Sequence, residues 1–443
     1  MKKIKNRPLL VAMVLLFGQN VVGAQVPKNM SLSQAIDLAI SSSSQLKVDS
    51  VNYQIAESRW QQTKQANLPQ VNLNASYIRI SDNITPFKVG FPTGEVVLNP
   101  QILNQSYNAL QVRQLIFSGG KVKQAEKINF LEKNLATLQQ KKSKNEIAVA
   151  VTNIWFSLFT INQNRAIVQA NLLQLQKQRI DVQNFVQQGI ALENDLLKID
   201  LAITNLQASL SEIESIKKTL QFNLGTFTGV AEWEQLDVEP VVPTVQVPFE
   251  NLDVALETAY NNRPELAMFK LRKAQTDAAN TIIKGNIWPT ISTGGSYNYD
   301  LPNQRLFPNQ AVFTGTWNVG VFFNWNLTDL YTNKEKKSEG NFNQQKISFA
   351  VDAAKKGISM EISEKYNQWT QAKQQVKSYK VAVQQAEENY RVEKNRYQQN
   401  IVTTTDFLNA NTQLLQSKIN LVAGDANVAL AYQNLLHSIY IKN

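Results

Sequence analysis

The chain has 443 residues, no cysteine and a formal net charge of +10. Its length predicts two or three units rather than one simple domain, and the lack of cysteine excludes disulfides, thiolate metal sites and a lipidated N-terminal cysteine. The positive charge is spread along the chain rather than gathered in one block, so the sequence does not indicate nucleic-acid binding.

Residues 1–24 have the layout of a secretory signal peptide. Four basic residues within the first seven precede a short apolar stretch at 9–17, and the small residues Gly23 and Ala24 follow before a cleavage point ahead of Gln25. An uncleaved anchor is the alternative, but the apolar stretch falls short of the roughly 20 residues that a spanning helix needs. If the mature chain crosses a membrane, we expect it to do so with strands.

An internal repeat organises the rest of the sequence. Residues 31–46 align with 251–266, and residues 184–197 align with 395–408 in the same order. We therefore predict two structural repeats, 25–230 and 251–443, each with a helix, two strands and a long helical hairpin. The segment 231–250 between them contains three prolines and several acids, which favours an irregular connector.

Four strands are predicted at about 68–81, 105–117, 288–300 and 312–327, because apolar and polar residues alternate there. One face is apolar and rich in aromatic residues, which suits lipid, and the other carries Asn, Ser and Thr, which suits a wet lumen. A sandwich sheet over a core is the alternative. The predicted lipid-facing residues are Val71, Leu73, Tyr77, Tyr297, Tyr299, Trp317, Val319, Val321, Phe323 and Trp325.

Four strands cannot close a membrane barrel alone, so several copies must contribute. A dimer would give about 8 strands and a trimer about 12, and only the larger barrel would leave an open pore. The connections at 82–104 and 300–311 contain several prolines or glycines and are expected to be loops on the extracellular side.

Two helical hairpins are predicted at about 120–226 and 333–440, with sharp breaks at Gly189 and Asn400. Apolar residues recur with a seven-residue period, which indicates left-handed supercoiled packing. The first long helices, at about 121–188 and 335–399, would each extend roughly 100 Å at 1.5 Å per residue. An ordinary coiled-coil stalk would explain this period, but it would not explain the paired strands or the repeat.

Nothing in the sequence indicates an enzyme, a cofactor or a metal site. His437 is the only histidine and has no second histidine or cysteine with which to share a metal. No nucleophile motif is present, and the pair Gly119-Gly120 lacks the other residues of a phosphate-binding loop.

The sequence resembles the TolC-like outer-membrane efflux proteins. The resemblance is carried by the repeated SLSQAIDLAI/NLDVALETAY opening, by NLPQVNLNASY/NIWPTISTGGSY, by QLIFSGGK and by the two hairpin tips. It implies a mixed α and β fold: a homotrimer whose transmembrane β-barrel, with four strands from each chain, continues into a periplasmic α-helical coiled-coil barrel. It also implies an exit duct in the outer membrane that receives cargo from an inner-membrane transporter, of RND or ABC type, through a periplasmic adaptor.

The resemblance also assigns roles at the tips. Tyr397 and Asp195 match a latch that keeps the family's tip closed, Asp406 matches a cation-favouring ring, and Val402 stands where the latch arginine would be. Asp195 and Asp406 also have a simpler interpretation as helix N-caps. The expected adaptor-docking residues are Gly189, Ile190, Ala191, Asn400, Ile401 and Val402.

The resulting hypothesis is a passive, non-enzymatic duct of a tripartite efflux or type I secretion system, gated at its periplasmic tip. The alternative is a structural or adhesive coiled-coil surface protein anchored by a small β-barrel. Drugs, metal ions and polypeptides all remain possible cargo, because no residue defines a substrate pocket.

Overall fold

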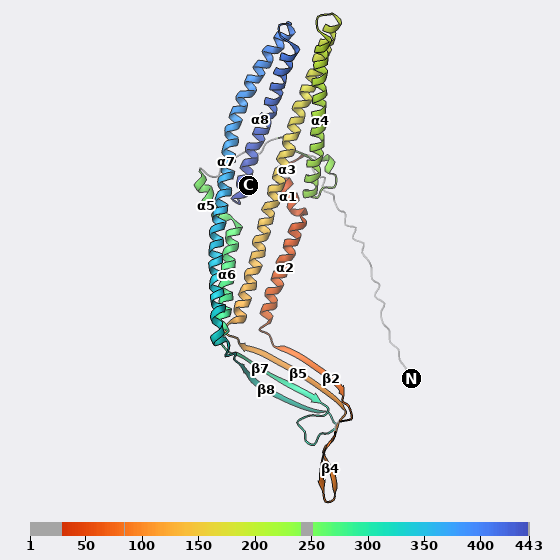
Figure 1. Ribbon diagram of the computed structural model, residues 1–443, viewed down its shortest axis with the longest axis vertical. Helices are drawn as coiled ribbons and strands as arrows, with labels where there is room; N and C mark the ends of the chain where they lie inside the picture. Colours follow the sequence, from red (N-terminus) through yellow and green to blue (C-terminus); the bar gives the residue numbers. More distant parts are fainter. Residues whose placement is uncertain (1–28, 84, 241–250, 442–443) are drawn as a thin grey trace, which may run out of the picture.

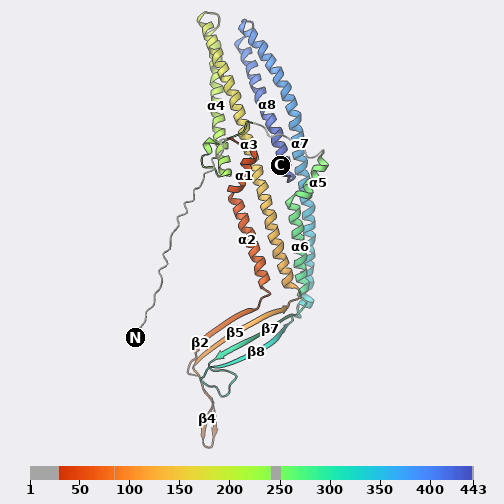
Figure 2. The same cartoon turned by 180° about the vertical axis from the view of Figure 1, so that it is seen from behind.

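The computed structural model describes residues 29–83, 85–240 and 251–441, so the predicted signal peptide lies outside the described residues. The molecule is long and narrow, with helices at one end and a sheet at the other (Figure 1). Two long helical hairpins reach the end opposite the sheet, and their tips lie at the same level (Figures 1 and 2).

The two repeats contribute the same series of elements, except that the first has an additional hairpin, β3–β4. In the first repeat these are α1 (Leu32–Ser42), α2 (Ser44–Gln65), β2 (Gln70–Arg79), β3 (Phe87–Phe91), β4 (Gly94–Asn99), β5 (Asn104–Phe117), α3 (Lys121–Gln187) and α4 (Glu193–Thr228). In the second they are α5 (Leu252–Asn262), α6 (Pro264–Gly285), β7 (Thr290–Asp300), β8 (Thr314–Asn324), α7 (Asp329–Gln398) and α8 (Thr404–Ser438).

The short helices α1 and α5 are each followed by a break of one residue before the next helix begins. At the first break, the Ser43 hydroxyl accepts a hydrogen bond from the Leu46 amide and so caps α2. At the second, Pro264 is the first residue of α6, a position where its missing N–H costs nothing. The two repeats therefore bend at equivalent points with different chemistry.

The four long strands form one antiparallel sheet in the order β2-β5-β7-β8. Residues that face each other across the sheet alternate between apolar and polar rows. The apolar row is Leu73, Leu110, Tyr297 and Trp317, and the adjacent polar row is Asn72, Gln111, Ser296 and Asn318. Within the described residues the edge strands β2 and β8 have no outer partner, so each leaves a row of backbone hydrogen-bonding groups unpaired.

The segment 82–104 was predicted to be a loop. It also contains a separate hairpin, formed by β3 and β4. Lys88 and Glu95 form an ion pair of 3.4 Å across it. A turn at Pro92-Thr93 joins the strands and ends at Gly94, whose φ of +131° suits glycine. The alternation of Phe87, Val89 and Phe91 is short, but it supports a strand when β4 lies opposite.

The connector is only partly irregular. Its described residues include a short helix, η1 (Trp233–Gln235), and a strand, β6 (Asp237–Val238), which pairs in parallel with β1 (Asn29–Met30). Residues 241–250, with the remaining prolines, lie outside the described residues. The start of the described chain is thus held beside the connector.

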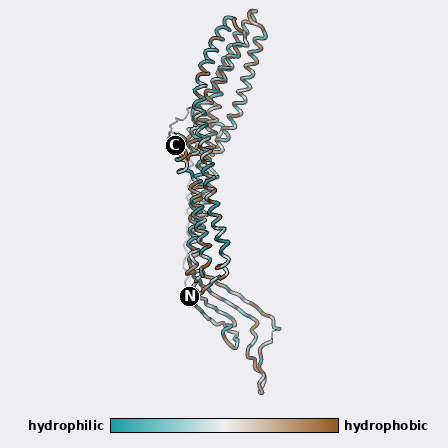
Figure 3. The backbone as a smooth tube through the Cα atoms, turned by 60° about the vertical axis from the view of Figure 1, so that its left-hand side comes forward, coloured by the Kyte–Doolittle hydropathy of each residue, from teal (hydrophilic) through white to brown (hydrophobic). Residues whose placement is uncertain are grey.

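The helices form a wall one layer thick. Near the sheet the neighbours are α2, α3, α6 and α7 in that order, and toward the tips they are α4, α3, α8 and α7. α3 and α7 have 67 and 70 residues and run through both parts, over about 100 Å each. Hydrophobic and hydrophilic residues are interleaved along the tube (Figure 3).

One face of α3 packs against the short elements around its middle. Trp155 and Phe159 are buried there, and the Trp155 indole N–H donates to the Met30 carbonyl at 2.9 Å. Ser157 is rotated by about 200° from Trp155 and so lies on the opposite face, as does Gln139, five helical turns earlier. Among the helices that the structure describes, none has the length and apolar character of a membrane-crossing helix.

Candidate functional site: the helical tips

The first hairpin tip is a tight turn built on Gly189. Its φ is +72°, and the Ile190 amide donates to the Phe185 carbonyl at 2.8 Å. This six-residue hydrogen bond after a left-handed residue is the Schellman ending of a helix, which satisfies carbonyl groups that α3 would otherwise leave unpaired. The sequence places glycine where the backbone requires a left-handed conformation.

The second tip repeats this geometry with asparagine. Asn400 has a φ of +59°, and the Ile401 amide donates to the Arg396 carbonyl at 2.9 Å. Asparagine is one of the few residues with a side chain that enters the left-handed region at modest cost. Gly189 and Asn400 are therefore structurally equivalent.

The interpretation of Asp195 and Asp406 as N-caps was wrong by three positions. The N-cap residues are Leu192 and Thr403, because the turns consume three residues before the helices restart. Asp406 instead closes a capping box: its carboxylate accepts from the Thr403 amide at 3.1 Å, and its own amide donates to the Thr403 hydroxyl at 3.2 Å. Hydrogen bonds from the Thr403 side chain and amide lower the pKa of Asp406.

Asp195 has a weaker version of the same role. Its carboxylate accepts from the Leu192 amide at 3.4 Å and lies 3.5 Å from the Lys198 ammonium. Leucine has no acceptor to return the hydrogen bond, so only half of a capping box forms. The first tip is therefore less firmly capped than the second.

Tyr397 is buried within its own hairpin. Its ring stacks on Phe407 at a centroid distance of 5.0 Å, and its hydroxyl lies 3.2 Å from the Thr404 hydroxyl. Burial raises the pKa of Tyr397, the Thr404 hydrogen bond opposes this shift, and the negative charge of Asp195 adds to it. Tyr397 and Asp195 thus interact through charge across the two hairpins, whereas the hydrogen bond goes to Thr404.

An apolar cluster joins the two hairpins below their tips. Phe407 is fully buried in it, together with Val182 of α3 and Ile199 of α4. α3 is in contact with α8 along this region. Neither Thr404 nor Phe407 was proposed as a tip-gate residue from the sequence.

A polar junction interrupts this apolar contact. The Asn171 and Asn411 amides exchange hydrogen bonds of 2.8 and 3.2 Å between α3 and α8, and the Gln174 amide donates to the Tyr390 hydroxyl of α7. Burial raises the pKa of Tyr390, and the hydrogen bond from Gln174 opposes that shift. Sequence reasoning missed this junction. The only feature of the sequence that could have indicated it is the presence of polar residues beside heptad positions in an otherwise apolar seam.

The tip surface carries exposed apolar side chains. Ile190 and Ile401 occupy equivalent positions and are 54% and 59% exposed, and Leu192 beside them is exposed too. Gly189 and Asn400 are also at the surface, whereas Ala191 and Val402 are half-buried. Exposed apolar groups that cluster at the end of a rod are typical of a surface that binds another protein.

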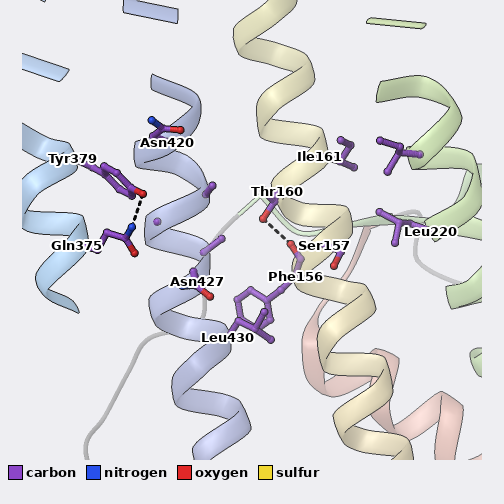
Figure 4. A pocket seen from close by; sticks show the side chains of 14 residues that line it. Phe156, Ser157, Thr160, Ile161, Leu220, Gln375, Tyr379, Asn420, Asn427 and Leu430 are labelled. Atoms are coloured by element: carbon purple, nitrogen blue, oxygen red, sulfur yellow. Dashed lines mark hydrogen bonds between the residues drawn. The ribbon is translucent and has the colours of Figure 1, made fainter. Parts of the chain in front are cut away.

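A groove with a volume of about 610 Å³ lies between the hairpins, further from the tips than the apolar cluster (Figure 4). Thr160 and Ile161 of α3 and Leu220 of α4 line one side, and Tyr379 and Asn427 line the other. Gln375 donates to the Tyr379 hydroxyl at 2.7 Å. None of the lining residues is charged, and the groove contains Ser157, so it lies on the face of α3 opposite Trp155.

The residues predicted to face lipid are all exposed in the single chain, from 44% for Trp325 to 75% for Val319. Trp325 lies one residue beyond β8. On the opposite face the Asn318 amide donates to the Ser296 hydroxyl at 2.7 Å. The sheet therefore has one bare apolar face and one hydrogen-bonded polar face.

His437 is part of a buried polar group rather than a metal site. Its ring nitrogens lie 3.2 Å from the Thr152 hydroxyl and 3.3 Å from the Asn145 side-chain oxygen. Burial lowers the pKa of His437 to about 4. No cluster of potential metal ligands occurs in the described part of the chain.

Comparison with known proteins agrees with this architecture. Residues 255–439 match the family model described as outer membrane efflux protein. This match covers most of the second repeat. The predicted mixed α and β fold class is confirmed, and the predicted family, the location in the outer membrane and the lack of enzymatic activity agree with this partial match.

Solved structures with a similar fold cover nearly the whole chain. The outer membrane protein VceC from Vibrio cholerae has a TM-score of 0.75 at 16% identity, covering 92% of this chain and 95% of VceC. The CmeC outer membrane channel of Campylobacter jejuni has a TM-score of 0.74 at 14% identity, over 92% and 85%. The MtrE outer membrane channel of Neisseria gonorrhoeae, in its open state, gives 0.69 at 15%, over 92% and 88%.

At these identities the likeness concerns the fold. No curated protein matches the sequence significantly. The first repeat lies outside the family match but has the same series of elements as the second, with the β3–β4 hairpin in addition.

Proposed function

We propose that three copies of this chain assemble into a passive exit duct in the outer membrane, gated at its periplasmic tip. The observation that carries the proposal is the sheet: it has two unpaired edge strands and one bare apolar face. In lipid, the backbone groups along the two edges of such a sheet find hydrogen-bond partners only when the edges pair with other copies.

Trimeric closure follows from pore size. Three sheets of four strands give about 12 strands, which leaves an open lumen, whereas two give about 8, which side chains would fill. β2 and β8 run in opposite directions, so β8 of one copy pairs with β2 of the next in the antiparallel manner that the other strands use. The polar row that contains Asn318 then lines the lumen.

The helical wall continues this lumen. Its curved single layer places α1 and the β1–β6 pair on one side and the uncharged groove on the other. We assign the groove side to the lumen, since the short elements would obstruct a passage. With tips about 100 Å from the sheet, the duct spans the periplasm. An uncharged lining does not select among cargoes, which leaves that choice to the transporter.

Partners are proposed for the tips. Ile190 and Ile401, with Leu192, form the surface for a periplasmic adaptor, which links the duct to an inner-membrane transporter of RND or ABC type. The sequence has no nucleotide-binding motif, so the adaptor must supply the energy of opening by binding the open tip more tightly than the closed one. Tyr397, Asp195 and Asp406 are proposed to hold and line the closed aperture.

Single-channel conductance in planar bilayers tests this function. Wild type is compared with Tyr397→Ala/Asp195→Ala, which removes both the buried ring and the charge beside it. Tyr331→Ala is the matched control, because Tyr331 is 74% exposed and lies at the sheet end of α7. We expect a small cation-selective current from wild type and from the control, and a much larger current from the double variant.

Absence of current from all three proteins, despite trimeric assembly in the bilayer, would count against the duct and favour an anchored stalk. A large current from wild type that the double variant leaves unchanged would support a pore but contradict the gate.

A further inference from the structure

The β3–β4 hairpin has an apolar face that nothing in its own chain covers. Phe87 is 60% exposed, Phe91 52% and Val96 47%. Val89 lies directly opposite Val96, so these side chains share one face with Phe87 and Phe91. The Lys88–Glu95 ion pair lies on the other face, beside Val97. One face of the hairpin is therefore apolar throughout, whereas the other carries an ion pair and a single valine.

The hairpin lies beyond the sheet rather than alongside it. Figure 1 shows it extending past the end of β2, along the long axis and away from the helices. Strands β2 and β8 have 10 and 11 residues, which is the length that crosses a bilayer, so lipid that covers the sheet is not expected to reach the hairpin. An apolar face left in water at this place is typical of a protein–protein contact.

A second apolar surface lies at the opposite edge of the same end. The segment 301–313 leads into edge strand β8 and exposes Phe307 (74%) and Val312 (50%). This segment is well anchored: Leu301 exchanges backbone hydrogen bonds with Ser106 at 2.7 and 2.8 Å, and the buried Asn303 amide donates to the Thr314 carbonyl at 3.1 Å. The start of this segment is thus anchored to the sheet, and Phe307 lies exposed four residues further along it.

We infer that these two surfaces bind each other between neighbouring copies of the chain. The inference rests on the proposed closure of β2 against β8. The hairpin follows β2 and the loop precedes β8, both at the end of the sheet away from the helices. When β8 of one copy pairs with β2 of the next, the loop of the first comes beside the hairpin of the second.

Such a contact is heterologous, since different surfaces meet, and three copies close it into a ring. Phe87 and Phe91 on one copy contact Phe307 and Val312 on the next. The ring braces the extracellular mouth of the barrel at each seam, where backbone pairing alone would otherwise join the copies.

Cysteine cross-linking tests the inference cleanly, because the chain has no cysteine of its own. The variant Phe91→Cys/Phe307→Cys carries one thiol on each surface. Its matched control is Gly90→Cys/Phe307→Cys, which moves the first thiol to the opposite face. A Cβ at Gly90 meets no atom within 4 Å, so the control is expected to fold.

Oxidation of the purified protein in detergent is followed by denaturing gels without reductant. We expect Phe91→Cys/Phe307→Cys to give covalent dimers and trimers. The Gly90→Cys/Phe307→Cys control and both single-cysteine variants should give no covalent trimer. Light scattering of the same samples reports whether the trimer exists at all.

The outcomes separate the two proposals. No trimer by light scattering overturns the proposed assembly and the inference with it. A trimer without cross-links at Phe91 overturns the inference alone. Quenching of a bimane label at Phe91→Cys by nitroxide lipids in liposomes would assign the face to lipid and would also overturn the inference.

Discussion

The hydroxyl pair of Tyr397 and Thr404 joins the end of α7 to the start of α8 across the second tip. Thr404 is 3% exposed, and Tyr397 is 9% exposed. Tyr397→Phe keeps the ring stacked on Phe407 but leaves the Thr404 hydroxyl without this partner. Thr404→Val leaves the Tyr397 hydroxyl without its partner instead. A buried polar group deprived of its partner costs about 1–3 kcal/mol, whereas replacing both partners by apolar groups is nearly neutral.

The two single variants should therefore destabilise the tip, and the double variant should restore most of the loss. A cost of 1–2 kcal/mol raises the opening equilibrium by about 5- to 30-fold. Amide hydrogen exchange over 396–410 in the detergent-solubilised protein measures this local opening without requiring global unfolding. Thr412→Val serves as the control, because its exposed hydroxyl donates only to the Leu408 carbonyl of its own helix. If the effects of the two substitutions simply add, the hydroxyls do not depend on each other and the proposed bond is absent.

Three further predictions concern other parts of the chain. His437 has a folded pKa of about 4 against 6.5 unfolded, so its neutral form contributes stability above pH 6.5 that is lost as the pH falls toward 4; calorimetry should show a loss of about 3 kcal/mol that His437→Gln largely removes. Gly189→Ala should destabilise the first tip by about 1–2 kcal/mol because the residue has a positive φ, and Gly189→Asn should destabilise it less. Hydrogen exchange at the tip measures both effects, and equal effects would refute the conformational argument. Val319→Arg should weaken insertion into liposomes by about 2–4 kcal/mol, and Asn318→Arg on the other face should not; similar losses would refute the assignment of faces.

The sequence was sufficient to predict the fold class because its signals are long. The heptads run through helices of 67 and 70 residues, so single exceptions do not disturb the period. Arg165 and Arg179 of α3 occupy positions in the period that are otherwise apolar, and they form ion pairs with Glu214 and Asp200 on α4. The β3–β4 hairpin was missed because its alternation is only five residues long and lies among prolines and glycines that are typical of loops.

The tip turns could be located because few residues enter the left-handed region, and Gly189 and Asn400 both do so. The contacts around them could not be predicted, since they depend on where each helix restarts. Asp406 lies three residues after the cap, where it closes a capping box instead of capping the helix itself. The pairing of Asn171 with Asn411 joins positions 240 residues apart, which no local pattern reports. The assignment of docking and gating residues stays a prediction.

The continuity of α3 and α7 from sheet to tip has a mechanical consequence. Their partners change at the middle of the molecule, where α2 and α6 give way to α4 and α8, so this level acts as a fulcrum on two unbroken levers. α4 has 36 residues, which gives the tip end an arm of about 54 Å. A tilt of about 5° at the fulcrum moves a tip by roughly 5 Å, given this arm at 1.5 Å per residue. An aperture bounded by such levers can widen by several ångströms while every helical hydrogen bond stays intact.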